Sequence, residues 1–232
     1  MGASSGIGRA VGLAASAAGA DIALAARQYD QLTEVAREAG PNAIALQCDV
    51  RVPIACELAV RAAVQHLHGL DVVVFATGVN HLAMLADTPL EAWRDVLETN
   101  LIGAALTTRA VLPELRTSGG RIAYLSSHSV GRPWPGLGAY AASKAGLDAM
   151  INAWRNEEPG VSFTRVIVGP TITGMADDWD PATAAAMFDR WSDEGYMTYE
   201  PATAESVADR IVRWAASDPP AHDLHLVDTA AS

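Results

Sequence analysis

Short apolar runs rich in Val, Ile and Leu alternate along the chain with longer, Ala-rich amphipathic segments. The short runs fit buried strands and the longer segments fit helices, which is the pattern of repeated strand–helix units around a parallel sheet. The predicted strands are 21–26, 43–47, 70–76, 121–126, 162–168 and 223–227. The pattern therefore predicts one α/β domain over residues 1–232, a doubly wound parallel sheet flanked by helices.

Two further stretches qualify this pattern. Residues 88–91, with the sequence TPLE, predict a capping box with proline at the first helical position. The helix that they open is expected to reach about residue 116, with a break near Asn100. Residues 174–200 contain Pro, Trp and Asp and interrupt the alternation before the last predicted helix and strand. We expect this segment to be mobile and to form a lid.

The first eight residues, MGASSGIG, form a glycine-rich turn ahead of a predicted helix over residues 9–18. Glycines let the backbone approach a phosphate, and a helix N-terminus offers free N–H groups and the positive end of its dipole. Such a turn normally follows a strand, but no apolar run precedes this one. The usual first strand of the sheet is therefore expected to be missing.

Composition and charge exclude several classes of protein. The formal net charge is −11 and the pI is about 4.8, so we expect no nucleic-acid partner. The sequence has no run of about 18 apolar residues and no charged leader before an apolar stretch, so we expect no membrane partner and a cytoplasmic location. Cys48 and Cys56 lack a CxxC spacing, and the histidines lack a ligand spacing, which predicts reduced thiols and no metal site.

Lys144 is the only lysine among 16 Lys and Arg residues, and it lies four residues after Tyr140. Side chains at this spacing project from one face of a helix. A compact ammonium near a phenol favours the phenolate and lowers its pKa, whereas the planar fork of arginine suits carboxylates and phosphates. We interpret the pair as acid–base machinery; an exposed Tyr–Lys pair without a function is the alternative.

With three further motifs, this pair resembles the pattern of the classical short-chain dehydrogenase/reductase family. The glycine loop and the catalytic tetrad of the family match these positions: Gly2, Gly6, Gly8, Asn100, Ser127, Tyr140 and Lys144. Successive members of the tetrad are separated by 27, 13 and 4 residues, as in the family, and the resemblance covers essentially the whole chain. It implies a Rossmann-type domain that carries a dinucleotide at the carboxyl ends of its strands and transfers hydride between a secondary alcohol and a ketone.

The resemblance also implies a role for each member of the tetrad. Tyr140 would be the general acid/base at the substrate oxygen. Ser127 would hold that oxygen by a hydrogen bond, with its neighbour Ser126 as the alternative. Asn100 would anchor a water close to Lys144, while a helix-breaking asparagine with a satisfied side chain is the alternative.

The cofactor is expected to be NADP(H) rather than NAD. NAD-preferring members of the family carry an acidic residue where this chain has Ala26, because a carboxylate binds the adenosine ribose. Arg27 follows, and its guanidinium can pair with a 2′-phosphate. A surface arginine without this role is the alternative. Asp49 and Val50 match the adenine contacts of the family, and Asp49 is also credible as a helix cap.

Two segments depart from the family pattern. Its NNAG segment reads FATG at residues 75–78, and its PG segment reads VGPTIT at residues 168–173. We expect modest effects on cofactor affinity, because backbone groups do most of the binding there. The full set of expected cofactor-binding residues is Gly2, Ser4, Ser5, Gly6, Ile7, Gly8, Arg27, Asp49, Val50, Ala76, Gly78, Tyr140, Lys144, Gly169, Thr171 and Thr173.

The expected lid is rich in large apolar side chains. The candidates to cover a substrate are Trp134, Trp179, Met187, Phe188 and Trp191. Ordinary core or subunit packing is the alternative for them. The acidic residues of the lid are interpreted as a solvated face or a helix cap rather than metal ligands, namely Asp177, Asp178 and Asp180.

Partners and a competing function complete the expectations. The resemblance implies a small-molecule alcohol or carbonyl substrate and a homodimer or homotetramer built on the helices that carry Asn100 and Tyr140. Because the first strand is expected to be missing, the alternative function is that of a truncated or non-catalytic nucleotide-binding or partner-binding relative.

Overall fold

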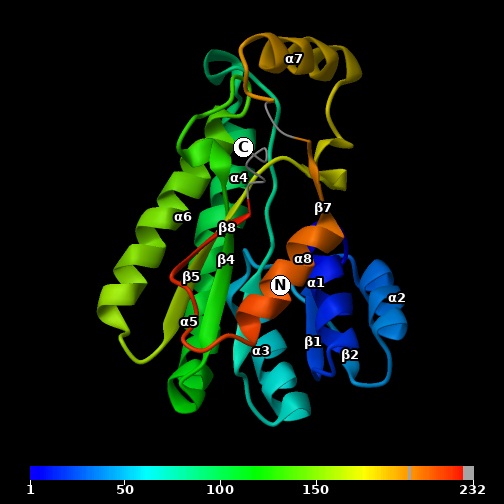
Figure 1. Cartoon of the computed structure of the whole chain (residues 1–232), viewed down its shortest axis with the longest axis vertical. Helices are drawn as coiled ribbons and strands as arrows, with labels where there is room; N and C mark the ends of the chain where they lie inside the picture. The colour runs from blue at the N-terminus through cyan, green and yellow to red at the C-terminus, as the bar shows by residue number, and fades with distance from the viewer. Residues whose placement is uncertain (198–199, 227–232) are drawn as a thin grey trace.

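The computed structural model describes residues 1–197 and 200–226 (Figure 1). Six strands fall on the six predicted apolar runs, and the predicted α/β class is confirmed. They are β1 (Ile22–Ala26), β2 (Ala43–Gln47), β3 (Val72–Phe75), β4 (Arg121–Ser127), β5 (Ser162–Val168) and β8 (Asp223–Leu226). Val227, the end of the last predicted run, lies outside the described residues. Two strands of two residues, β6 (Thr171–Ile172) and β7 (Ala202–Thr203), pair with each other and were not predicted.

Helices connect most of these strands. They are α1 (Gly6–Ala17), α2 (Tyr29–Ala39), α3 (Pro53–Leu67), α4 (Leu90–Leu97), α5 (Gly103–Ser118), α6 (Gly138–Glu157), α7 (Pro181–Asp193) and α8 (Ala204–Ala215). Short 3₁₀ turns are η1 (Leu85–Asp87), η3 (His128–Val130) and η4 (Gly174–Ala176). Within the described ranges, none of the helices combines the length and the apolarity that a membrane span requires.

The long helical stretch differs in part from its prediction. The break near Asn100 is confirmed, because a π-helical turn, η2 (Glu98–Ile102), separates α4 from α5. The predicted capping box is wrong. Pro89 is the N-cap of α4 rather than its first residue, and the Thr88 hydroxyl donates to the Met84 carbonyl at 2.9 Å instead of capping the helix.

The sheet is divided by a gap. Strands β3, β4, β5 and β8 form one parallel ladder in this order, and β1 and β2 form a separate parallel pair. The gap lies between β1 and β3 as they stand side by side in space, and no strand of the described residues fills it. A missing strand was expected here, because no apolar run precedes the glycine loop. The first residues of the chain bridge the two parts: the Gly2 and Ala3 amides donate to the Ala25 carbonyl at 2.7 Å and 3.2 Å, and the Ala76 amide donates to the Met1 carbonyl at 3.0 Å.

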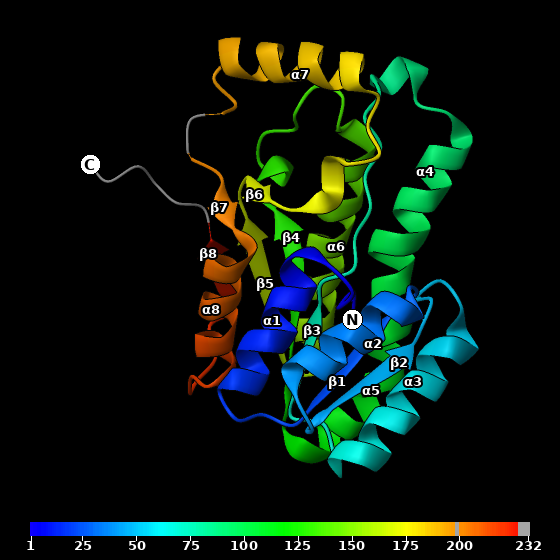
Figure 2. The same cartoon turned by 90° about the vertical axis from the view of Figure 1, so that its right-hand side faces the viewer.

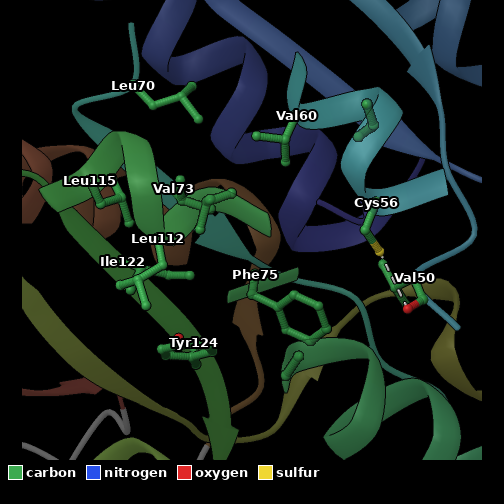
Figure 3. Close-up of a cluster of buried hydrophobic side chains, with 14 of the residues drawn as sticks. Val50, Cys56, Val60, Leu70, Val73, Phe75, Leu112, Leu115, Ile122 and Tyr124 are labelled. Carbon is green, nitrogen blue, oxygen red and sulfur yellow. Dashed lines mark hydrogen bonds between the residues drawn. The ribbon is translucent and has the colours of Figure 1, made fainter. Parts of the chain in front are cut away.

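Two helical layers cover the sheet (Figure 2). Along β4, Ile122 and Tyr124 face the layer of α3, α5 and α6, where they join the apolar cluster drawn in Figure 3. Ala123 and Leu125 face the opposite layer, which contains α1 and α8. This alternation follows from the two-residue period of a strand. Because all paired strands are parallel, their carboxyl ends meet at one edge, where the candidate site lies.

Candidate functional site

Gly78, Asn100 and Lys144 converge just beyond the carboxyl end of β3. A Cβ atom at Gly78 would lie 3.4 Å from Lys144 Nζ and 3.6 Å from Asn100 Oδ1. It would also lie 4.0 Å from Met175 Cε, so the start of the predicted lid closes the same space. The glycine of the FATG segment thus lies directly against these two polar side chains.

Asn100 is fully buried, and the π-helical turn brings it into contact with the segment after β3. Its Oδ1 accepts from the Val79 amide at 2.8 Å, and its Nδ2 donates to the Val79 carbonyl and to Ser143 Oγ, both at 2.9 Å. These bonds fix the side chain in one orientation. They also link the turn to α6, which carries the Tyr–Lys pair.

Ser127 ends β4 and lies beside Tyr140. Its Oγ accepts from the Ser129 amide at 3.1 Å and is 2.9 Å from the Ser129 hydroxyl. A hydrogen bond with Ser127 lowers the pKa of Tyr140, although burial has the larger effect and raises it. Ser126 points to the other side of the strand, because successive side chains alternate. Of the two serines, Ser127 is therefore the one placed next to the phenol.

Lys144 is 3% exposed, and its Nζ donates to the Leu125 carbonyl at 2.7 Å. The ammonium lies 5.7 Å from the centre of the Tyr140 ring. Burial lowers the pKa of Lys144 to about 8, and the charge of Asp148 partly opposes this effect. The expectation that Lys144 makes the phenol acidic is not met in this structure, since the net shift of the Tyr140 pKa is upward and the opposing hydrogen bond comes from Ser127.

The glycine loop is packed as closely as its sequence predicts. A Cβ atom at Gly8 would lie 2.1 Å from the Gly2 carbonyl oxygen, and one at Gly2 would lie 2.7 Å from the Thr77 amide nitrogen. Gly6 opens α1 with a φ of +51°, a backbone conformation that favours glycine. A Cβ atom at Gly6 would be 3.5 Å from the Thr173 side chain, so the loop and the segment after β5 face each other.

The loop is suited to an anionic ligand. Ser5 is the N-cap of α1, but its side chain forms no cap hydrogen bond, and the first turn contains no acidic residue. The first amides of a helix lack intrahelical partners, and its dipole favours an anion there. Thr77 Oγ1, beside Gly2, is buried without a hydrogen-bond partner in the described residues. These residues, with Ser4 and Ile7 in the same turn, fit the pyrophosphate of a dinucleotide.

The edge beyond β1 and β2 carries the residues expected at the adenosine. Arg51 pairs with Asp49 at 2.7 Å and with Asp95 at 3.2 Å, and these contacts hold the Asp49 carboxylate and lower its pKa. Val52 is the N-cap of α3, so Asp49 does not cap that helix. Arg27 is exposed directly after β1, and its charge contributes to the lowered pKa of Asp49. Val50 is buried next to Asp49.

The segment after β5 completes the edge. The Gly169 amide donates to the Leu226 carbonyl at 3.4 Å, and the Thr171 hydroxyl donates to the Gly169 carbonyl at 3.0 Å. Thr173 caps η4, because its hydroxyl accepts from the Met175 amide at 3.4 Å. The structure therefore gathers the expected cofactor-binding residues along one edge, with Ala76 placed there by its bond to Met1.

The predicted lid contains α7, which lies across the carboxyl end of the sheet (Figures 1 and 2). Its aromatic side chains pack on one another: Trp191 has ring-centre distances of 5.1 Å to Trp134, 5.3 Å to Phe188 and 6.0 Å to Trp179. Sequence reasoning missed Asn80, whose Oδ1 accepts from Trp179 Nε1 at 2.8 Å. This tether joins residues 99 positions apart, so no local pattern could indicate it.

The polar residues of the lid have structural roles or lie in solvent. Asp180 caps α7 by accepting from the Thr183 amide at 2.9 Å, as the helix-cap interpretation predicted. Asp177 and Asp178 are exposed. No group of three or more His, Cys, Asp or Glu residues in the described part of the chain is arranged to hold a metal ion.

Comparisons with known proteins find similar sequences and structures. The family model for the short chain dehydrogenase matches residues 1–184. A glycine betaine reductase of Emericella nidulans is 33% identical over 76% of this chain, which spans 15% of that protein. The 11-beta-hydroxysteroid dehydrogenase 1A of Arabidopsis thaliana is 37% identical over 72% of this chain, which spans 50% of that protein. The chain thus spans half or less of these two curated relatives.

Solved structures show the same fold over nearly the whole chain. An alcohol dehydrogenase from the archaeon Thermococcus sibiricus, complexed with 5-hydroxy-NADP, has a TM-score of 0.84 at 24% identity and covers 97% of this chain and 93% of its own. A short-chain dehydrogenase from Streptomyces avermitilis has a TM-score of 0.83 at 26% identity and covers 98% of this chain and 86% of its own.

Proposed function

The chain belongs to the short-chain dehydrogenase family, and on this premise we propose that it is an NADP(H)-dependent oxidoreductase that interconverts a secondary alcohol and a ketone. Its membership supports the general alcohol and ketone chemistry. The observation that carries the finer proposal is the convergence of Tyr140, Ser127, Lys144 and Asn100 at the edge where the glycine loop begins.

In the proposed reaction, the substrate oxygen lies between the Ser127 hydroxyl and the Tyr140 phenol. Burial keeps the pKa of Tyr140 above its ordinary value of 10.0, so at neutral pH the phenol carries its proton and can donate it to a ketone oxygen. A reduced dinucleotide, held by its pyrophosphate at the glycine loop, would supply the hydride from its nicotinamide. Ser127 would stabilise the negative charge that develops on the substrate oxygen.

Lys144 and Asn100 would support the proton transfer. An ammonium 5.7 Å from the Tyr140 ring stabilises the phenolate that remains after donation. Asn100 holds the Val79 backbone and Ser143 on either side of the site, and we propose that a water between Asn100 and Lys144 returns the proton from solvent. Each role belongs to a side chain that the surrounding bonds keep in place.

The preference for NADP(H) rests on the surface beyond β1. Ala26 contributes no carboxylate there, and the exposed Arg27 adds a guanidinium that suits a 2′-phosphate. The other residues that would hold the cofactor are the glycine loop, the Asp49–Val50 pair, Ala76, Gly78 and the Gly169–Thr173 segment. Dissociation constants for NADPH and NADH test this preference, and equal values would contradict it.

The decisive variant for the mechanism is Tyr140→Phe, assayed with NADPH and a panel of ketones. Loss of the phenolic proton is expected to reduce turnover by about 10³-fold, while NADPH binds as in the wild type. Tyr29→Phe is the matched control, because Tyr29 is 46% exposed on α2. Full turnover in Tyr140→Phe would remove the mechanism. A wild-type chain that binds NADPH and turns over no carbonyl would favour the non-catalytic alternative.

The proposed homo-oligomer has support from exposed apolar side chains on the helices concerned. Leu90 on α4 is 56% exposed and Ile102 on η2 is 48% exposed. A dimer or tetramer that buries these side chains would remove apolar surface from water. Light scattering measures the mass in solution, and a monomer at micromolar concentration would contradict the proposal.

A further inference from the structure

A row of charged side chains extends from Lys144 across the face of the sheet that α6 covers. Asp148 lies one helical turn after Lys144 on α6 and is 9% exposed. Its Oδ2 is 3.4 Å from Arg165 Nη1 on β5, and Arg165 Nη2 is 2.6 Å from Asp223 Oδ2 on β8. Arg155, near the end of α6, pairs with Asp223 at 3.0 Å. Positive and negative groups therefore alternate from the candidate site to the last strand.

The ion pair with Arg165 engages only one of the two carboxylate oxygens of Asp148. Its Oδ1 is buried without a hydrogen-bond partner of normal geometry among the described residues, and so is Ser126 Oγ on β4. Burial raises the pKa of the Asp148 carboxyl, and the nearby Ser126 hydroxyl and Arg165 guanidinium lower it in part. A buried carboxylate with one unpaired oxygen costs folding free energy. Packing alone therefore does not explain why an aspartate occupies position 148.

The neighbours of Lys144 suggest a reason. The groups that face it are neutral on β4 and η2 and titratable on α6; they are Leu125, Asn100, Tyr140 and Asp148. Arg165 is occupied by both carboxylates and adds a positive charge behind Asp148. Asp148 is the anion whose charge acts on Lys144, and it opposes the effect of burial on the ammonium.

We propose that Asp148 is a positioning residue that keeps Lys144 in the charged form that Tyr140 requires, an inference that rests on the function proposed above. Asp148 touches neither the phenol nor the expected substrate oxygen, and it acts through the ammonium one turn away. With a pKa of about 8, Lys144 is charged in about nine tenths of the molecules at pH 7. A pKa lower by about one would leave only half of them charged.

The single lysine makes a direct test possible. In an untagged chain grown with ¹³C,¹⁵N-lysine, the side-chain signal of Lys144 is the only lysine signal, and its shift against pH gives the midpoint of titration. Asp148→Asn is expected to move this midpoint down by about one pH unit. Asp223→Asn is the matched control, since it removes a carboxylate from the same arginine but leaves Asp148 in place, and its midpoint should match the wild type.

A second variant, in which the Lys144 midpoint should move in the opposite direction, tests the proposal if Asp148→Asn does not fold. Arg165→Gln removes a cation from the row, while Asp223 keeps its pair with Arg155. The midpoint of Lys144 is then expected to rise. An unchanged midpoint in either folded variant overturns the inference.

Ketone reduction gives the second measurement. Activity is expected to fall at alkaline pH as Lys144 loses its proton, because Tyr140 is more basic and loses its proton at higher pH. In Asp148→Asn, the pH at which activity falls should decrease by as much as the Lys144 midpoint does. A purely structural role would instead lower turnover by one factor at every pH. Asp148→Glu should restore the wild-type profile.

The two proposals fail in different ways. If Tyr140→Phe keeps full turnover while the Lys144 midpoint still depends on Asp148, the proposed mechanism is wrong and the electrostatic link remains. If Tyr140→Phe abolishes turnover but Asp148→Asn changes neither the midpoint nor the alkaline fall, this inference alone is wrong.

Discussion

On one side of the gap in the sheet, β3, β4, β5 and β8 form a continuous ladder; on the other, β1 and β2 form a pair joined to that ladder through Met1 and Gly2. The larger part, here called the catalytic half, holds the proposed catalytic groups Lys144 and Asn100 as buried side chains with defined partners. Lys144 and Asn100 are 3% and 0% exposed. The β1–β2 part is here called the cofactor half. The groups proposed to bind the cofactor there are closely packed backbone and the exposed side chain of Arg27.

This difference has an energetic consequence. A buried ammonium costs folding free energy, so substitutions in the catalytic half should change stability and turnover together. An exposed side chain such as Arg27 contributes little to stability, so its substitution should change affinity alone. The glycine loop lies between the two halves, and its backbone contacts should matter to both.

The largest effect is expected at this junction, in Gly8→Ala. The new Cβ atom would lie 2.1 Å from the Gly2 carbonyl oxygen, a backbone atom that cannot rotate away. We expect a loss of about 3 kcal/mol or more in the free energy of unfolding and at least about 100-fold weaker NADPH binding. Denaturant unfolding and cofactor titration measure the two effects.

Gly160→Ala is the matched control for that substitution. A Cβ atom at Gly160 meets nothing within 4 Å, so its stability should stay within about 0.5 kcal/mol of the wild type. If Gly8→Ala behaved like this control, the loop would not be the tight junction between the halves.

The second-largest effect is expected in Lys144→Met. This substitution removes the free-energy cost of burying the Lys144 ammonium. The drop in pKa from 10.5 to about 8 corresponds to about 3 kcal/mol of destabilisation at neutral pH. Losing the hydrogen bond to the Leu125 carbonyl destabilises the variant by about 1 kcal/mol. The variant should therefore be about 2 kcal/mol more stable at pH 7, with turnover largely lost.

The sign of the pH dependence checks the cause. Between pH 8 and 10.5 the unfolded chain still binds the proton that the folded chain has released from Lys144, so this group makes the wild type more stable as pH rises. The advantage of Lys144→Met should accordingly shrink across this window. An advantage that stayed constant with pH would mean that packing, rather than charge burial, separates the two proteins.

Much of this comparison could be predicted from the sequence. Apolar runs place all six long strands, and the spacing of the tetrad indicates which residues meet at the edge. Burial is harder to predict: a phenol near an ammonium was expected to be acidic, yet its surroundings raise the Tyr140 pKa. The TPLE segment shows the limit of local rules, because Thr88 has a competing acceptor in the preceding turn. Long-range partners such as Asn80 and Trp179 leave no local pattern.

The third effect belongs to the cofactor half. Arg27→Ala should weaken NADPH binding by about 10- to 100-fold, since a charge-assisted pair with the 2′-phosphate is worth about 1.5–3 kcal/mol. NADH binding and the free energy of unfolding should not change. Arg37→Ala, on the exposed side of α2, is the control that should alter neither affinity. A stability loss in Arg27→Ala would break the contrast between the halves.

The smallest effect tests which half holds the lid. Trp179 donates to Asn80 Oδ1 at 2.8 Å, and Trp191 donates to the Pro135 carbonyl at 2.9 Å; both acceptors follow strands of the catalytic half. Asn80→Ala removes one of these tethers, worth about 1 kcal/mol, so the KM for a ketone should rise about threefold to fivefold. NADPH affinity should stay the same, as it should in the control Asn42→Ala, before β2. A weaker NADPH affinity in Asn80→Ala, with KM unchanged, would instead assign the lid to the cofactor half.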